Sequence, residues 1–246
     1  MSAQSNADGP RPEAPAAPRA AREILGDRLS AAERYVELLA DTGVSHGLVG
    51  PREVPRLWER HVLNCAVVQE IIPAHQRVID VGSGAGLPGL VLALARGDLD
   101  VHLVEPMLRR TTWLTDAVAA LGLTNVTVHR ARADELARGL SAPVVTARAV
   151  ARLDRLADWC LPLVEPHGRL LALKGASAAT ELEEDLPKLG HWDLAAAEVV
   201  LLGEDLLPEP TRVVTLTRGA ASTGPAARRG RRTPARRTGG GRTRRG

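Results

Sequence analysis

Strand-like and helix-like segments alternate along the chain from residue 77 onward. Five short apolar segments predict strands: "RVIDV", "VHLVE", "VTVHR", "VVTAR" and "RLLALK". Between and after them, helical spacing predicts helices over 90–96, 108–121, 153–163 and "ATELEEDLPKL". Near the end, "DLAAAEVVLL" and "TRVVTLT" predict an antiparallel pair. This alternation indicates an α/β fold, with a mainly parallel sheet covered by helices on both faces.

The region before residue 77 has a different, helical pattern. Ser30 and Glu33 have the spacing of a capping box at the start of one helix. Pro55 suits the first turn of a second helix. We therefore expect a helical cap over residues 21–75, preceded by a disordered segment, residues 1–20, that is rich in Pro and Ala.

The charge of the chain is unevenly distributed. Of the 246 residues, 32 are basic and 29 acidic, but nine arginines lie within 220–246, which holds no acidic residue. The rest of the chain therefore carries a net charge of −6. We expect residues 76–219 to form the α/β domain. Residues 220–246 should be a disordered tail, which either attracts nucleic acid or is only a solvated extension.

No apolar run is long enough to span a bilayer, and the N-terminus lacks the apolar core of a signal peptide. We therefore expect a cytoplasmic protein without membrane contact. The seven histidines show no spacing typical of zinc ligands, so we expect no metal.

The stretch "DVGSGAGLPG", which follows the first predicted strand, can be interpreted in two registers. Gly84, Gly86 and Gly89 match the dinucleotide fingerprint G-x-G-x-x-G. That register leaves Gly82 unexplained and puts Pro88 inside the turn that would hold a pyrophosphate. In the other register, an acidic residue precedes G-x-G-x-G at Gly82, and Pro88 begins the next helix. The second register is favoured, and its ligand carries no pyrophosphate.

Further polar residues follow the other strands. Glu105 ends the second strand, where it is placed to accept hydrogen bonds from ribose hydroxyls. Ala133 and Asp134 follow the third strand and either flank an adenine or, for Asp134, cap the next helix. Arg148 ends the fourth strand. Because ligands of such sheets bind beyond the carboxyl ends of the strands, these residues and 82–87 should surround one crevice.

Four segments together carry a more specific resemblance: "LWERHVLNC", "DVGSGAGLPG", "TARAVARLDRLADWC" and "LLALKG". In this order, over about residues 30–218, the chain resembles the RsmG (GidB) family of bacterial N7-guanine methyltransferases of small-subunit ribosomal RNA. The resemblance implies a class I S-adenosylmethionine-dependent methyltransferase fold, which is Rossmann-like. It also implies 16S rRNA as partner, with a guanine of the decoding-centre loop as target.

Carried over by motif, one set of residues is implied to bind S-adenosylmethionine: Gly82, Gly84, Gly86, Leu87, Glu105, Ala133, Asp134 and Arg148. A second set is implied to lie on the RNA side or to hold the pocket: Arg60, His61, Arg132, Arg148 and Lys174.

Several of these residues have structural alternatives. His61 either positions the target base or is a hydrogen-bonded residue under the cap, and Arg60 either binds phosphate or pairs with Glu59 or Glu53. Arg132 either binds RNA or pairs with Asp134 or Glu135. For Lys174, at the end of a parallel strand, we favour a position near phosphate. For Arg148, a position near the cofactor carboxylate or the target base is favoured.

The N7 atom of guanine has an in-plane lone pair and no proton to lose, so we expect no catalytic base; alignment of the reacting atoms supplies much of the rate. The chain has no Phe and one Tyr, so it lacks the aromatic platform of a single-strand binder. With the acidic main part of the chain, this favours a small ribosomal subunit or assembly intermediate over naked RNA as substrate. A monomer is expected.

Two other functions remain open. An NAD(P)-dependent oxidoreductase would use the first glycine register and bind nicotinamide cofactor. A non-catalytic RNA-binding protein would depend on the arginine tail and lose its function when residues 221–246 are deleted, whereas a methyltransferase would at most associate more weakly and with greater sensitivity to salt.

Overall fold

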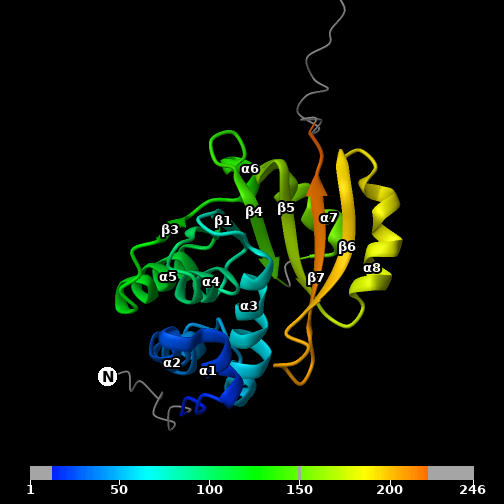
Figure 1. Ribbon diagram of the computed structural model, residues 1–246. Coiled ribbons are helices and arrows are strands. Elements are labelled where there is room, and N and C mark those ends of the chain that lie inside the picture. Colours follow the sequence, from blue (N-terminus) through cyan, green and yellow to red (C-terminus); the bar gives the residue numbers. More distant parts are fainter. Residues whose placement is uncertain (1–12, 149–150, 221–246) are drawn as a thin grey trace, which may run out of the picture.

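The computed structural model describes residues 13–148 and 151–220. A seven-stranded sheet forms its centre, with strand order β3-β2-β1-β4-β5-β7-β6 (Figure 1). The first five strands are parallel, and β7 runs antiparallel to both β5 and β6. The strands are β1 (Arg77–Val81), β2 (Asp100–Val104), β3 (Val126–His129), β4 (Ala142–Arg148), β5 (Val164–Lys174), β6 (Leu194–Leu202) and β7 (Thr211–Arg218). The predicted parallel sheet and closing antiparallel pair are confirmed.

Helices cover both faces of this sheet, as the alternating pattern predicts. One face packs against α4, α5 and the cap, and the other against α6, α7 and α8, so that two apolar clusters form. The helices of the sheet region are α4 (Gly89–Ala95), α5 (Leu108–Ala120), α6 (Ala133–Leu136), α7 (Leu153–Cys160) and α8 (Ala178–Asp185).

Helical turns at the N-terminal end form the predicted cap, at the bottom of Figure 1. Its α-helices are α1 (Arg19–Leu25), α2 (Leu29–Leu38) and α3 (Asn64–Ala66). The second predicted helix begins earlier than expected, because tight 3-10 turns over Pro51–Arg56 precede the wider turns Leu57–Leu63. Pro55 thus lies inside a helical segment, whose first residue is the other proline, Pro51.

Part of the N-terminal segment expected to be disordered packs onto this cap. The indole Nε1 of Trp58 donates a hydrogen bond to the carbonyl oxygen of Pro15 at 2.8 Å, and α1 begins at Arg19. For residues 13–20 the expectation of disorder is therefore wrong. The remainder of that segment and the arginine tail from residue 221 lie outside the described residues.

Two general expectations can be compared with the described part of the chain. Within residues 13–148 and 151–220, no helix combines the length and apolar character that crossing a membrane would require. In the same ranges, no three His, Cys, Asp or Glu side chains lie close enough together to bind a metal ion.

Candidate active site

The sheet register brings the predicted site residues to one edge. Val81 of β1 lies beside Val104 of β2 and Ala147 of β4. The residues that follow these three are therefore neighbours at the carboxyl ends of the strands: Gly82, Glu105 and Arg148. The strand order reverses between β1 and β4, which is the position where α/β sheets bind ligands.

The glycine loop turns sharply from β1 toward α4. Gly82, Gly84 and Gly86 have φ values of 73°, 55° and 92°, a region of backbone conformation that favours glycine. A Cβ atom at Gly86 would lie 2.4 Å from Leu90, so this glycine also permits close packing. At Gly84 a Cβ would meet only the Gly82 carbonyl oxygen, at 3.8 Å. Gly84 is therefore the point where a ligand can approach the backbone.

Asp80, the last but one residue of β1, holds the start of α4. Its buried carboxylate accepts hydrogen bonds from the Gly89 amide at 3.1 Å and from the Thr146 hydroxyl at 3.2 Å. Burial raises the pKa of Asp80 to about 6, against the opposing effect of these hydrogen bonds and that of Ser83. At neutral pH the N-terminus of α4 therefore faces a carboxylate of the protein itself, which disfavours a pyrophosphate there.

Glu105 lies directly under the glycine loop. Its carboxylate accepts hydrogen bonds from the amides of Gly84 at 3.1 Å and Met107 at 3.0 Å, and its side chain is 2 % exposed. The structure thus links the loop after β1 to the end of β2 through one carboxylate. The sequence analysis did not single out Met107, an apolar residue that is 42 % exposed beside Glu105. Its position two residues after the acid that ends β2 could have indicated it.

After β3, the structure contradicts one of the two roles considered for Asp134, that of helix cap. Arg132 is the residue that caps α6, and its amide donates a hydrogen bond to the Glu135 carboxylate at 2.9 Å. Asp134 is therefore not the helix cap, because it is the second residue of α6. Its side chain is 72 % exposed and lies 3.5 Å from the Arg132 guanidinium. Arg132 thus has both of the acidic neighbours that its structural alternative names. Ala133 is buried and Leu87 half-buried.

Arg148 reaches from β4 into the cap. Its guanidinium donates hydrogen bonds to the carbonyl oxygen of Arg60 at 3.0 Å and to Nδ1 of His61 at 2.9 Å, and it also contacts the Cys65 thiol. Because Nδ1 of His61 accepts, Nε2 carries the proton and donates to Glu53 at 2.9 Å. Burial and the positive charge of Arg148 lower the pKa of His61, which keeps the ring neutral.

This network matches the structural alternatives for the two cap residues. His61 is hydrogen-bonded under the cap, and the Arg60 guanidinium lies 3.8 Å from Glu53 with its side chain 58 % exposed. His61 therefore holds the Arg148 guanidinium by a hydrogen bond, whereas the Arg60 side chain remains exposed to solvent.

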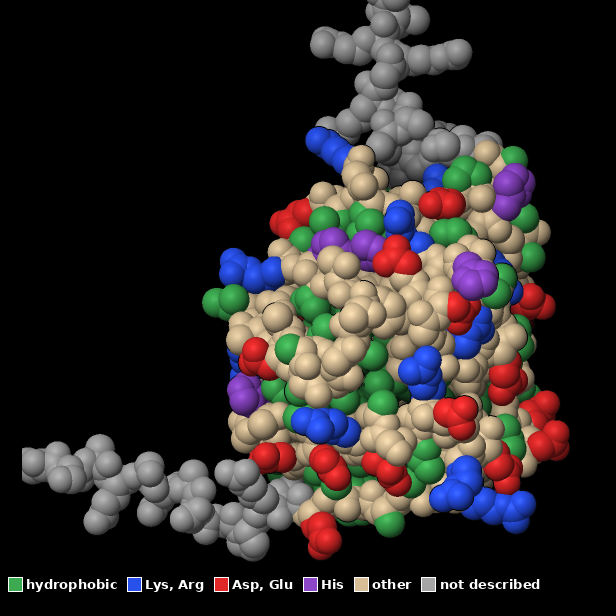
Figure 2. Space-filling view, turned by 60° about the vertical axis from the view of Figure 1, so that its left-hand side comes forward, with side chains coloured by type: hydrophobic (Ala, Val, Ile, Leu, Met, Phe, Trp, Pro, Cys, Tyr) green, Lys and Arg blue, Asp and Glu red, His purple; other side chains and the backbone are tan. Residues whose placement is uncertain are grey.

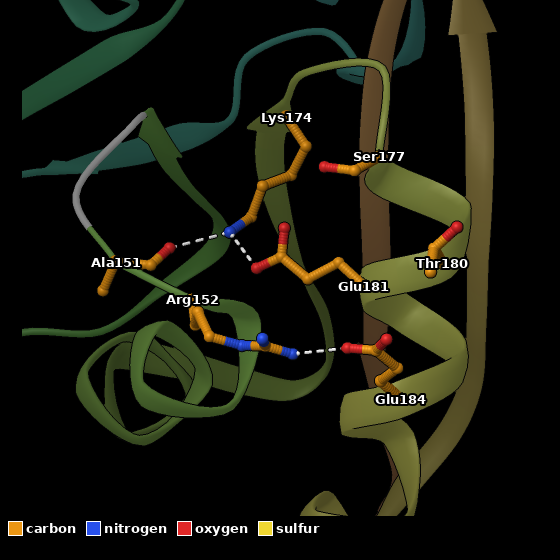
Figure 3. A pocket seen from close by; sticks show the side chains of 7 residues that line it. All are labelled: Ala151, Arg152, Lys174, Ser177, Thr180, Glu181 and Glu184. Atoms are coloured by element: carbon orange, nitrogen blue, oxygen red, sulfur yellow. Dashed lines mark hydrogen bonds and ion pairs between the residues drawn. The ribbon is translucent and has the colours of Figure 1, made fainter.

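Lys174 does not present its charge to solvent. It ends β5, one residue beyond the Leu173 that lies opposite Arg148. Its ammonium donates to Glu181 and to the Ala151 carbonyl oxygen, and its side chain is only 8 % exposed. The expectation of a phosphate contact for Lys174 therefore has no support from this geometry, since both partners are protein groups (Figure 3).

Comparison with known proteins places this architecture in a family. The model described as "GidB: rRNA small subunit methyltransferase G" matches residues 28–203. The "Ribosomal RNA small subunit methyltransferase G" of a Nocardioides species is 54% identical over 231 residues, which are 92% of each chain. The protein of the same name from Thermobifida fusca is 55% identical over 198 residues, 80% of this chain and 84% of its own.

Solved structures agree on the fold. An O-methyltransferase family protein from Burkholderia thailandensis superposes with a TM-score of 0.52 at 14% identity, covering 82% of this chain and 69% of its own. A SAM-dependent O-methyltransferase from Thermotoga maritima gives 0.50 at 17% identity, covering 69% and 71%. The fold is thus the Rossmann-like class I methyltransferase fold, and the chain belongs to the rRNA small subunit methyltransferase G (GidB) family.

Proposed function

We propose that this protein methylates 16S rRNA, transferring the methyl group of S-adenosylmethionine to N7 of a guanine in the decoding-centre loop. The observation that carries the proposal is the family match over residues 28–203. Relatives with more than half of their residues identical bear the name of a ribosomal RNA small subunit methyltransferase. The G-x-G-x-G register at Gly82, with positive φ values at Gly82, Gly84 and Gly86, supports the proposal.

The residues at the edge of the sheet fit S-adenosylmethionine. Gly84 has a positive φ, and the space that a Cβ atom would occupy there is open to a ligand. Glu105 lies beside it as an acceptor for ribose hydroxyls, and Met107 offers an exposed apolar surface for an adenine. Asp134 keeps an exposed carboxylate beyond β3. Gly82, Gly86, Leu87 and Ala133 complete the proposed cofactor site.

The bound cofactor supplies an electrophilic methyl group. The protein has to exclude water and to align guanine N7 with that group, because N7 has a free lone pair and no proton to remove. No residue is therefore assigned as a catalytic base. Arg148 ends β4 at the carboxyl edge of the sheet and is held in place by His61, so we propose that it positions the acceptor side of the site.

The RNA side of the proposed site is assigned to two exposed arginines, Arg60 and Arg132. The side chains of Arg60 and Arg132 are 58 % and 64 % exposed. Elsewhere, on the face shown in Figure 2, basic and acidic side chains are interspersed. Such a surface gives little general attraction for polyanions. This supports a small ribosomal subunit or an assembly intermediate, which presents one shaped loop, as the substrate of a monomeric enzyme.

The test is methyl transfer from labelled S-adenosylmethionine to small subunits from a strain that lacks this enzyme, with naked 16S rRNA in parallel. Gly82→Asp is the inactive control, because Gly82 has a φ of 73° at the start of the loop, directly after β1. Cleavage at 7-methylguanine locates the product. The proposal expects one labelled guanine in the decoding-centre loop, absent with the variant. Label at another site would overturn the target, and binding of NAD(P) in place of S-adenosylmethionine would overturn the cofactor.

A further inference from the structure

The carboxylate of Glu181, on α8, is the partner of Lys174. The two charged groups are 2.7 Å apart, and their side chains are 16 % and 8 % exposed. Both line a pocket of about 400 Å³ beyond the carboxyl end of β5. Figure 3 shows the ammonium of Lys174 directed at Glu181 and at the carbonyl oxygen of Ala151. If the Lys174 ammonium turned to another anion, the largely buried Glu181 carboxylate would lose its cationic partner, which is unfavourable.

Glu181 has a second function in this arrangement. The same oxygen, Oε1, accepts a hydrogen bond at 2.7 Å from the amide of Leu153, the first residue of α7. The first amides of a helix have no partner within the helix, and the N-cap residue of α7, Arg152, makes no capping hydrogen bond with its side chain. The amides of Asp154 and Arg155 bond the carboxylates of Asp185 and Asp154, and that of Leu153 bonds Glu181. Glu181 therefore caps α7 from a different helix, with a charge of the sign that a helix N-terminus stabilises.

The pair joins three elements beyond the carboxyl end of β5. Lys174 binds the carbonyl oxygen of Ala151 and Glu181 binds the amide of Leu153, so together they fix the start of α7 against β5 and α8. Arg148, which we propose to position the acceptor, ends β4 a few residues before this point. The chain near Arg148 is thus fixed on one side by the cap and on the other by this pair.

We infer that Lys174 and Glu181 act as one positioning pair, which holds the start of α7 so that Arg148 and the acceptor side of the site keep their geometry. Lys174 contributes no phosphate contact to RNA binding. The inference rests on the proposed function for its kinetic consequence. It assigns a role to Glu181 and replaces the phosphate contact expected for Lys174.

Four single variants of the full-length protein and one double variant test this inference. Glu181→Ala removes both hydrogen bonds, Glu181→Gln retains an acceptor for Leu153, and Lys174→Met removes the ammonium. The matched control is Glu184→Gln on the same helix. Glu184 lines the same pocket, but its side chain is 56 % exposed and bonds Arg152.

For Glu181→Ala and Lys174→Met, kcat for methyl transfer should fall roughly 30- to 100-fold, because small displacements of a reacting group have effects of that size. Glu181→Gln should lose about fivefold, and Glu184→Gln less than about twofold, as expected for an exposed pair. The KM for subunits and the Kd for S-adenosylmethionine should stay within about threefold of the wild type. The double variant Lys174→Met/Glu181→Ala should be no slower than either single variant.

Two further readouts separate positioning from RNA contact and from the proposed function. A phosphate contact by Lys174 would make the log Kd against log salt slope shallower by about 0.7–0.9 in Lys174→Met, and Glu181→Gln would bind RNA more tightly. Either result overturns the inference, as does an unchanged kcat in Glu181→Ala. Amide exchange at Leu153 should be at least about tenfold faster in Glu181→Ala. If exchange at Leu153 is faster in Glu181→Ala but the wild type does not methylate rRNA, the positioning pair is confirmed and the proposed function is contradicted.

Discussion

The hydroxyl of Tyr35 donates a hydrogen bond at 2.7 Å to the carbonyl oxygen of Ala85, at the centre of the glycine loop. Both residues are buried, and Tyr35 belongs to α2 of the cap. The cap therefore fixes the backbone of the glycine loop, and so contributes to the proposed cofactor site. Burial raises the pKa of Tyr35, so the hydroxyl remains a donor.

The variant Tyr35→Phe should lower the free energy of unfolding by about 1–2 kcal/mol, because the buried carbonyl of Ala85 loses its partner. It should also weaken S-adenosylmethionine binding several-fold in calorimetric titration. Thr42→Val is the control, because it removes another hydrogen bond of the cap, from Trp113 of α5 to Thr42. Equal effects of both variants on cofactor binding would show that Tyr35 has no specific relation to the loop.

Gly84→Ala should abolish most cofactor affinity, by about 100-fold or more, because the added methyl group occupies the side on which the ligand approaches. Gly47→Ala is a matched control: its φ of 65° is close to the 55° of Gly84, and a Cβ at either site has no close contact. Both variants should therefore lose about 1 kcal/mol of stability from backbone strain. Cofactor binding should change only in Gly84→Ala, and similar affinities for the two variants would contradict the site.

Arg148→Lys should reduce kcat by more than about tenfold and the free energy of unfolding by about 2 kcal/mol, because an ammonium cannot reproduce the several hydrogen bonds of the guanidinium. Arg169→Lys is the control, since Arg169 also links the sheet to the cap, through the carbonyl oxygen of Ile71, but from the opposite half of the β4–β5 pairing. Its kcat should remain near that of the wild type. A loss of stability with unchanged kcat in Arg148→Lys would remove this residue from the reaction.

Asp80 predicts an unusual dependence of stability on pH. Its pKa in the folded protein is about 6, above the value of about 4 for an unfolded chain. Between these values the folded state retains a proton that the unfolded state has released. The contribution of Asp80 to stability is therefore largest below pH 4 and declines as the pH rises toward 6.

Denaturant unfolding of the wild type and of Asp80→Asn across this pH range measures the effect as a difference between the two curves. Thr146→Val removes a hydrogen bond that lowers the pKa of Asp80, so the decline should extend to higher pH in that variant. Parallel curves for the wild type and Asp80→Asn would contradict the assignment.

The sequence by itself determined the order of strands and helices, the glycine register and the acid at the end of β2. These features are encoded locally, in the period of the apolar residues and in glycines at positions of positive φ. Helix boundaries are less well determined, because neighbouring residues compete for the same role. Arg132 caps α6 in place of Asp134, and α2 begins at Leu29, so Ser30 does not form the expected capping box.

Only the tertiary structure decided which partners the charged residues have. The hydrogen bond from Tyr35 to Ala85 spans 50 residues and that from Arg148 to His61 spans 87, so no local sequence pattern predicts them. Lys174 and Glu181 are close in sequence, but their common target, the start of α7, is set by the packing of α8 against α7 and the β6–β7 pair. A side chain at the end of a strand finds its partner only when strand order and helix packing are fixed, and for Lys174 that partner is a carboxylate of the protein itself.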